Sequence, residues 1–174
     1  MTPPRVPRLK WARRMAREFL AQQGITDPPV DAEALVRSLA SVRLFGHLTF
    51  DGFSFFDRRR SLHVVYVNTL IMSDGRKQWT WAHELGHIVL GHLRFFNCSD
   101  LPEHIRQILD READAFAAEL LMPAEWIHKF VPIPCDAKEL RFYKSFFGVS
   151  WEALINRLDE LRLQPREESE AYLR

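Results

Sequence analysis

The amino-acid sequence predicts an α+β fold, in which a short β-rich segment interrupts a chain made mostly of helices. Apolar residues recur at helical spacing near the N-terminus and again throughout the second half of the chain. Between these regions, residues 42–69 change to the alternating, β-branched and aromatic pattern of strands. The chain has 174 residues and a hydrophobic fraction of 47%, so we expect one domain with a packed core.

Two helices are expected before the strands. Over residues 9–23, apolar side chains fall on one helical face, and Gly24 follows where a helix would end. A second helix is expected after Asp31, whose side chain is a good N-cap. Within the strand segment, residues 62–67 give the strongest strand signal, and the charged run 57–61 is expected to be a hairpin tip.

Further helical patterns follow the strands and lead to the end of the chain. They cover residues 76–90, 102–122, 137–147 and 151–163, with a connecting loop expected over residues 91–102. We expect residues 1–163 to form a single domain, in which residues 137–163 resemble a helix-turn-helix. Residues 164–174 are charged and are expected to be a frayed tail.

Charge and composition exclude several classes of protein. The formal net charge of +1 gives no overall attraction to nucleic acid or acidic membranes, and no apolar run approaches 18 residues. The two cysteines, Cys98 and Cys135, do not make a disulfide framework, so a cytoplasmic protein is the simplest interpretation. The arginines at 58–60 could still contact phosphate groups, which leaves an activating nucleic acid as a partner to test.

The chemistry is carried by the motif H-E-x-x-H, formed by His83, Glu84 and His87 in a helical pattern. Residues i and i+4 lie one turn apart on the same face of a helix, so both imidazoles can reach one metal ion. Glu84 is rotated away from that face by one residue. It is expected to act as the general base on a water molecule at the metal.

A third metal ligand is expected on the helix of residues 102–122. Its apolar residues form a core-facing stripe, yet Glu112 lies on that stripe. A buried carboxylate is costly unless it is paired or bound to a cation, so Glu112 would complete a two-histidine, one-glutamate site. Glu119 near the edge of the stripe and His92 after the motif are the other candidates. Asp114 is expected to point away from the metal, either behind a metal ligand or in solvent.

Two segments resemble the ImmA/IrrE family of bacterial metallopeptidases. They are Arg76–Leu90 (RKQWTWAHELGHIVL) and Arg111–Pro123 (READAFAAELLMP). The family typically has R-x-R-F-T-x-A-H-E-x-G-H followed by E-A-x-x-F-A-A-x-L-L-M-P. This chain departs from the pattern at Gln78 and Trp79, where Arg and Phe are usual.

The resemblance implies a zincin-like metallopeptidase fold, with a small twisted sheet beside the motif helix, a crossing ligand helix and a helical tail. It makes His83, His87 and Glu112 the ligands of one zinc ion per chain and Glu84 the general base. It also implies that the substrate binds as an extended strand along a sheet edge, at residues 62–68 or a neighbouring strand. The implied substrate is a helix-turn-helix repressor, cleaved in a prophage, mobile-element, DNA-damage or anti-phage response.

Two alternatives concern regulation and activity. Cys98 lies in the loop between the two ligand-bearing helices, so its thiolate could occupy the open metal position and hold the enzyme inactive. The alternative to an enzyme is a non-catalytic regulator that binds a repressor or a toxin on the same zinc fold. A closed site with four ligands would look the same in sequence.

Overall fold

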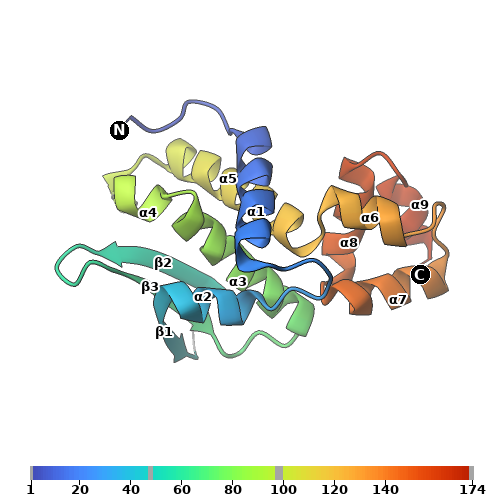
Figure 1. The fold of residues 1–174 in the computed structure, drawn as a ribbon, viewed down its shortest axis with the longest axis horizontal. Helices are drawn as coiled ribbons and strands as arrows, with labels where there is room; N and C mark the ends of the chain where they lie inside the picture. The colour runs from blue at the N-terminus through green and yellow to red at the C-terminus, as the bar shows by residue number, and fades with distance from the viewer. Residues whose placement is uncertain (1, 47–48, 97–99, 173–174) are drawn as a thin grey trace.

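The computed structural model describes residues 2–46, 49–96 and 100–172 of the chain. A small sheet and the helices next to it occupy one side of the molecule, and the helices after residue 123 gather on the other side (Figure 1). No helix in the described ranges combines the length and the apolar character needed to cross a membrane. The mixture of helices with one small sheet confirms the predicted α+β class and fits a zincin-like fold.

The sheet has three strands, β1 (Ala40–Phe45), β2 (Gly52–Asp57) and β3 (Leu62–Asn68), in the order β1-β3-β2. β3 is parallel to β1 and antiparallel to β2. The strand with the strongest sequence signal is therefore the central one, and its backbone pairs on both sides. The resemblance implies a substrate edge at residues 62–68 or a neighbouring strand. In the described sheet β3 is paired on both sides, so the edges are its neighbours β1 and β2.

Helix α1 (Leu9–Gln23) begins and ends where the sequence predicts, and helix α2 (Ala32–Leu39) begins directly after Asp31, as predicted. Gly24 ends α1 in the left-handed conformation, with φ 67°, and Asp31 accepts a hydrogen bond from the backbone N–H of Ala34 at 2.9 Å. α1 packs on α5, and α2 packs on α3 and β1. The N-terminal helices therefore pack against α3 and α5, the central helices described next.

The central pair of helices is α3 (Asp74–Val89) and α5 (Glu103–Leu121), which pack against each other. Gly86 makes this approach close, because a Cβ there would lie 3.1 Å from the Cα of Ala113. Between the two helices, the short helix α4 (His92–Phe95) forms in the segment that the sequence predicts to be a loop.

The helices after residue 123 form the far side of the molecule. They are α6 (Ala124–Phe130), α7 (Ala137–Phe147), α8 (Trp151–Glu160) and α9 (Arg166–Ala171). α6 was not predicted from the sequence. The frayed tail expected over 164–174 is wrong for its described part, because α9 packs on α8 and buries Ser169 completely.

A buried ion pair joins α5 to α8. Glu119 lies between Arg157, which is 1% exposed, and Arg17 of α1, whose Nη1 donates to Glu119 Oε1 at 2.9 Å. Arg157 also donates from Nε to the carbonyl of Met122 at 2.9 Å. Glu119, an alternative metal ligand in the sequence analysis, is therefore used to connect helices.

Replacing Arg157 by Ala is expected to lower the free energy of unfolding by about 3–5 kcal/mol, because it leaves the buried Glu119 carboxylate poorly compensated. Chemical denaturation of the full chain measures this. The matched control is Arg141→Ala, which removes an exposed arginine from α7. A loss of less than about 1 kcal/mol, the value typical of a surface pair, would show that Arg157 is not a structural link.

Candidate metal centre

α3 brings the residues of the H-E-x-x-H motif to one place. His83 and His87 lie one helical turn apart, with ring centroids 4.8 Å apart and their Nε2 atoms 3.1 Å apart. Both side chains point toward α5. The pairing of these two imidazoles follows from the i, i+4 spacing alone.

The residue of α5 that joins the two histidines is Asp110. Its Oδ1 lies 3.4 Å from Nε2 of His87, and one ligand atom from each of His83, His87 and Asp110 lies within 4.8 Å of the others. Asp110 was not predicted as a site residue from the sequence. One signal for it can be read from the sequence, because Asp110 and Asp114 are spaced one helical turn apart. In the structure, both carboxylates contact the motif histidines.

The chemistry of these donors fits a divalent metal ion. Asp114 Oδ1 lies 2.8 Å from Nδ1 of His83, so Nδ1 carries the proton that this hydrogen bond needs and Nε2 is left with a lone pair. That lone pair faces Nε2 of His87, an arrangement that a cation would stabilise. The 3.1 and 3.4 Å separations also match the edge of a tetrahedron with zinc–ligand bonds near 2.0–2.1 Å, which is roughly 3.3 Å.

The protonation states of the cluster favour the same interpretation. Burial lowers the pKa of His87 to about 4, so its ring is neutral at pH 7. Burial opposes ionisation of Asp110, but the imidazoles around it lower its pKa overall. Burial also opposes a charge on His83, yet Asp114 and the nearby carboxylates raise its pKa overall, which indicates a site that attracts positive charge.

Glu84 lies beside the cluster and faces β2. Its carboxylate is buried and accepts a hydrogen bond from Oγ of Ser54 at 2.5 Å. Burial raises its pKa above the usual value for Glu, which makes it a better proton acceptor. The neighbouring Gly52 leaves room, since a Cβ there would lie 3.4 Å from Oε1 of Glu84 and 2.9 Å from Thr80.

A cavity of about 320 Å³ lies between β2 and the two central helices. It is lined by Gly52, Phe53, Ser54, His83, Glu84, His87, Leu93, Arg106, Leu109 and Asp110. The cluster and Glu84 therefore share one cavity with the backbone of the edge strand. Arg106 adds a cationic side chain that the sequence analysis did not identify.

Glu112 is not part of this cluster. Its carboxylate is completely buried, as the sequence predicts, but its oxygens accept hydrogen bonds from Arg8. Burial alone would raise the pKa of Glu112, and the hydrogen bonds from Arg8 and His92 lower it to about 2. The counterion that the sequence analysis expected to be zinc is an arginine 104 positions earlier in the chain.

His92 lies behind His87, on the side away from the cavity. Gly91 adopts the left-handed conformation with φ 75°, which breaks the helix after α3 and directs His92 back toward the motif. Its Nδ1 lies 3.1 Å from Nδ1 of His87. Burial lowers the pKa of His92, so this ring too is neutral at pH 7.

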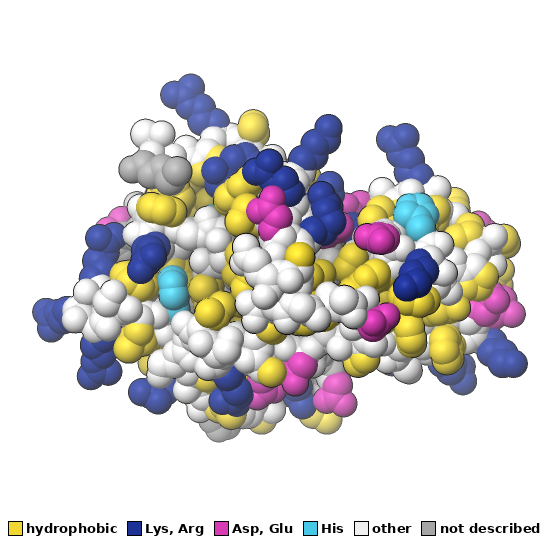
Figure 2. Space-filling view, in the orientation of Figure 1, with side chains coloured by type: hydrophobic (Ala, Val, Ile, Leu, Met, Phe, Trp, Pro, Cys, Tyr) yellow, Lys and Arg dark blue, Asp and Glu magenta, His cyan; other side chains and the backbone are white. Residues whose placement is uncertain are grey.

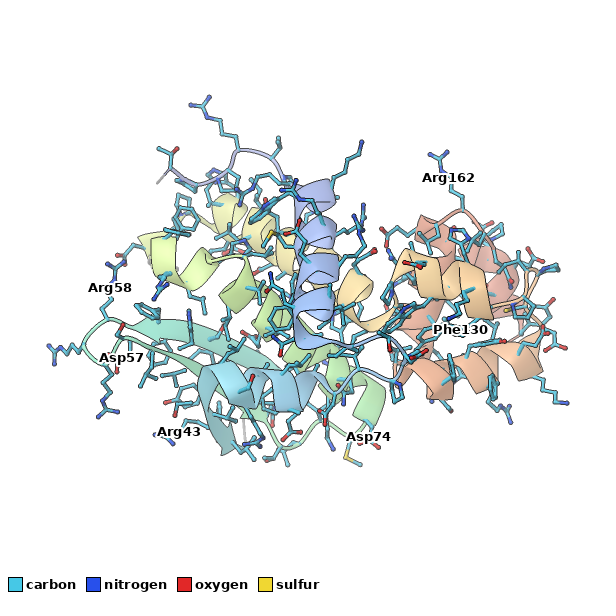
Figure 3. The ribbon with its side chains drawn as sticks, viewed as in Figure 1. Arg43, Asp57, Arg58, Asp74, Phe130 and Arg162 are labelled. Atoms are coloured by element: carbon cyan, nitrogen blue, oxygen red, sulfur yellow. The ribbon has the colours of Figure 1, made fainter. Side chains whose placement is uncertain are left out.

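Two other sequence predictions concern residues outside the cluster. Cys98 lies outside the described residues. Arg58–Arg60 form the exposed tip of the β2–β3 hairpin, where basic side chains gather and Arg58 extends into solvent (Figures 2 and 3). An activating contact with nucleic acid at this tip stays a prediction.

Comparison with known proteins agrees with the fold and with the motif. Residues 46–159 match the family model described as Peptidase_M78: IrrE N-terminal-like domain. A solved structure described as a Mycobacterium tuberculosis transcriptional regulator is similar, with a TM-score of 0.62 and 18% identity over 91% of this chain and 49% of that chain. This chain thus spans about half the length of that regulator, and the likeness shows the fold alone. None of the curated proteins matches the sequence.

Proposed function

We propose that this chain, which belongs to the family with an IrrE N-terminal-like peptidase domain, is a zinc-dependent endopeptidase. The observation that carries the proposal is the position of Glu84. Its buried carboxylate lies in the same cavity as His83, His87 and Asp110, next to the edge strand β2.

The proposed ligands of the metal are His83, His87 and Asp110, with Asp110 in place of Glu112. Two imidazoles and one carboxylate are typical of catalytic zinc, and three protein ligands leave one position open. When bound, such an ion would lower the pKa of a coordinated water molecule and polarise the carbonyl group of a peptide.

The residues around this site have distinct roles in the proposed reaction. An extended substrate would pair with the free edge of β2 and so bring its backbone across the cavity. Glu84 would take a proton from the attacking water and pass it to the leaving amine, and Ser54 would hold the carboxylate in place. Arg106 lines the cavity, and its half-exposed guanidinium pairs with Glu103 of the same helix; on release from that pair it would supply a positive charge for the peptide oxygen.

The proposed substrate is a helix-turn-helix repressor, and the proposed setting is a cytoplasmic response to DNA damage, a prophage or mobile element, or phage infection. Support comes from the resemblance of the motif segments to ImmA/IrrE metallopeptidases, which implies a narrow protein substrate. A cysteine switch at Cys98 remains a prediction.

The direct test uses a helix-turn-helix repressor, chosen by searching the genes next to that of this chain for one with a helix-turn-helix pattern. The purified repressor is incubated with zinc-loaded protein, and the products are identified by mass spectrometry. We expect one main cut, which a zinc chelator abolishes and added zinc restores. Stable binding of the repressor with no cut product would instead favour the non-catalytic regulator.

A further inference from the structure

The N-terminal segment before α1 reaches the metal centre through a row of hydrogen bonds. Arg8 donates to Glu112 Oε1 from its backbone N and its Nε, and to Oε2 from its Nη2, each at 2.8 Å. Arg8 lies outside the segment 46–159 that matches the family model. The row therefore connects a part of the chain that precedes the family match to the helix that carries Asp110.

The row continues from Glu112 to the motif. His92 is fully buried, with Nε2 3.0 Å from Oε2 of Glu112 and Nδ1 3.1 Å from Nδ1 of His87. His87 is thus contacted on its Nδ1 side by His92, while its Nε2 faces His83 and Asp110.

The direction of each hydrogen bond follows from what each atom can donate. The carboxylate of Glu112, ionised beside Arg8, only accepts, so Nε2–H of His92 donates to it. A neutral imidazole has one N–H, which leaves Nδ1 of His92 as an acceptor. Nδ1–H of His87 then donates to His92, and the lone pair of His87 is left on Nε2, facing the cluster.

We propose that Arg8, Glu112 and His92 form a positioning relay that holds His87 in the tautomer and orientation needed to bind the metal. This inference rests on the proposed function, because it takes the cluster of His83, His87 and Asp110 as the metal site. His92 plays the same part for His87 as Asp114 plays for His83. Each accepts a hydrogen bond from Nδ1–H of the motif histidine and so leaves the Nε2 lone pair of that histidine for the metal. Loss of an outer partner of this kind commonly weakens metal binding by about 10- to 100-fold.

The backbone at Gly91 and the packing of Arg8 both hold the relay residues in place. Gly91 has a left-handed φ of 75°, which residues with a side chain adopt only with strain, so glycine favours the turn that directs His92 inward. Arg8 is fixed as well, because its guanidinium lies over the ring of Trp11 at 4.1 Å.

The test measures zinc affinity and histidine tautomers in the full chain. Zinc affinity is obtained by competition with a chelating dye, and ¹⁵N-resolved NMR of the metal-free protein reports which ring nitrogen of His87 carries the proton. The variants are Arg8→Gln, His92→Leu and His92→Asn, and the matched control is Arg5→Gln, which changes an exposed arginine of the same segment. The amide oxygen of Asn can take the place of Nδ1 as an acceptor.

We expect Arg8→Gln and His92→Leu to weaken zinc binding by about 10- to 100-fold and to reduce the population of the Nδ1–H tautomer of His87. His92→Asn should recover part of both losses, and Arg5→Gln should change neither. If the wild-type protein binds zinc and all relay variants bind it equally with an unchanged tautomer, the relay is wrong while the proposed site stands. If the wild-type protein does not bind zinc, both proposals fail.

Discussion

Replacing Glu84 by Gln is expected to lower the rate of peptide cleavage by about 10²- to 10⁴-fold while leaving zinc affinity near that of the wild type. Gln keeps the shape of Glu84 and can still interact with Ser54, but it cannot accept a proton at neutral pH. Glu84 is not among the three residues whose ligand atoms cluster, so metal binding does not depend on it. Single-turnover cleavage of the repressor and chelator competition measure the two quantities.

Ser54→Ala is the graded companion to this variant. It removes the hydrogen bond to Glu84 and keeps the carboxylate, so a smaller loss of rate is expected. The assignment of Glu84 as the general base would be wrong if the Gln variant cut the repressor at the wild-type rate. It would also be wrong if that variant lost cleavage only because it lost zinc.

Replacing Asp110 by Ala is expected to reduce zinc affinity by more than about 100-fold, since it removes one of three protein ligands. Glu112→Gln should have a smaller effect of about 10- to 100-fold, because Glu112 acts on the site through His92. Chelator competition on the two purified variants gives both values.

Comparing the zinc affinities of these two variants shows which carboxylate of α5 is the metal ligand, although Asp110 and Glu112 are only two positions apart. A carboxylate that binds the metal contributes a bond to it, and one that orients a histidine contributes only indirectly. An Asp110→Ala variant that keeps wild-type affinity, beside a Glu112→Gln variant that has lost zinc, would return the ligand role to Glu112. Circular dichroism of both variants checks that each one is folded.

The sequence predicts local features of the site well, because they depend on helical spacing. The pairing of His83 with His87 follows from i, i+4 geometry, and the burial of Glu112 follows from its place on an apolar stripe. The partner of Glu112 could not be predicted this way. Arg8 is 104 positions away, and nothing local shows that the N-terminal segment crosses α5.

Asp110 was missed for a related reason. It lies off the apolar stripe of α5 and lines the open cavity, so its polarity is what any exposed helical position would show. Only its spacing from Asp114, one turn further along, indicates a shared role. The sheet gives a similar lesson, since the strong pattern of residues 62–67 marks a buried strand and not a substrate edge.

The last helix, α9, is a further element that the sequence pattern alone does not predict. The helix α9 is charged along its length, and its sequence is typical of a solvated tail. It is held by tertiary contacts, including the hydrogen bond from Arg166 to Asn156 of α8 at 2.8 Å. Such contacts depend on how the helices pack, which periodicity along a single helix does not reveal.

The central claim is that His83, His87 and Asp110 hold one zinc ion, and anomalous X-ray diffraction at the zinc edge of crystals grown with zinc tests it most directly. We expect one peak per chain, about 2.0–2.2 Å from Nε2 of both histidines and from the Asp110 carboxylate, with Glu112 still bound to Arg8. A peak coordinated by Glu112 and not by Asp110, or no peak between the two histidines, would contradict the account.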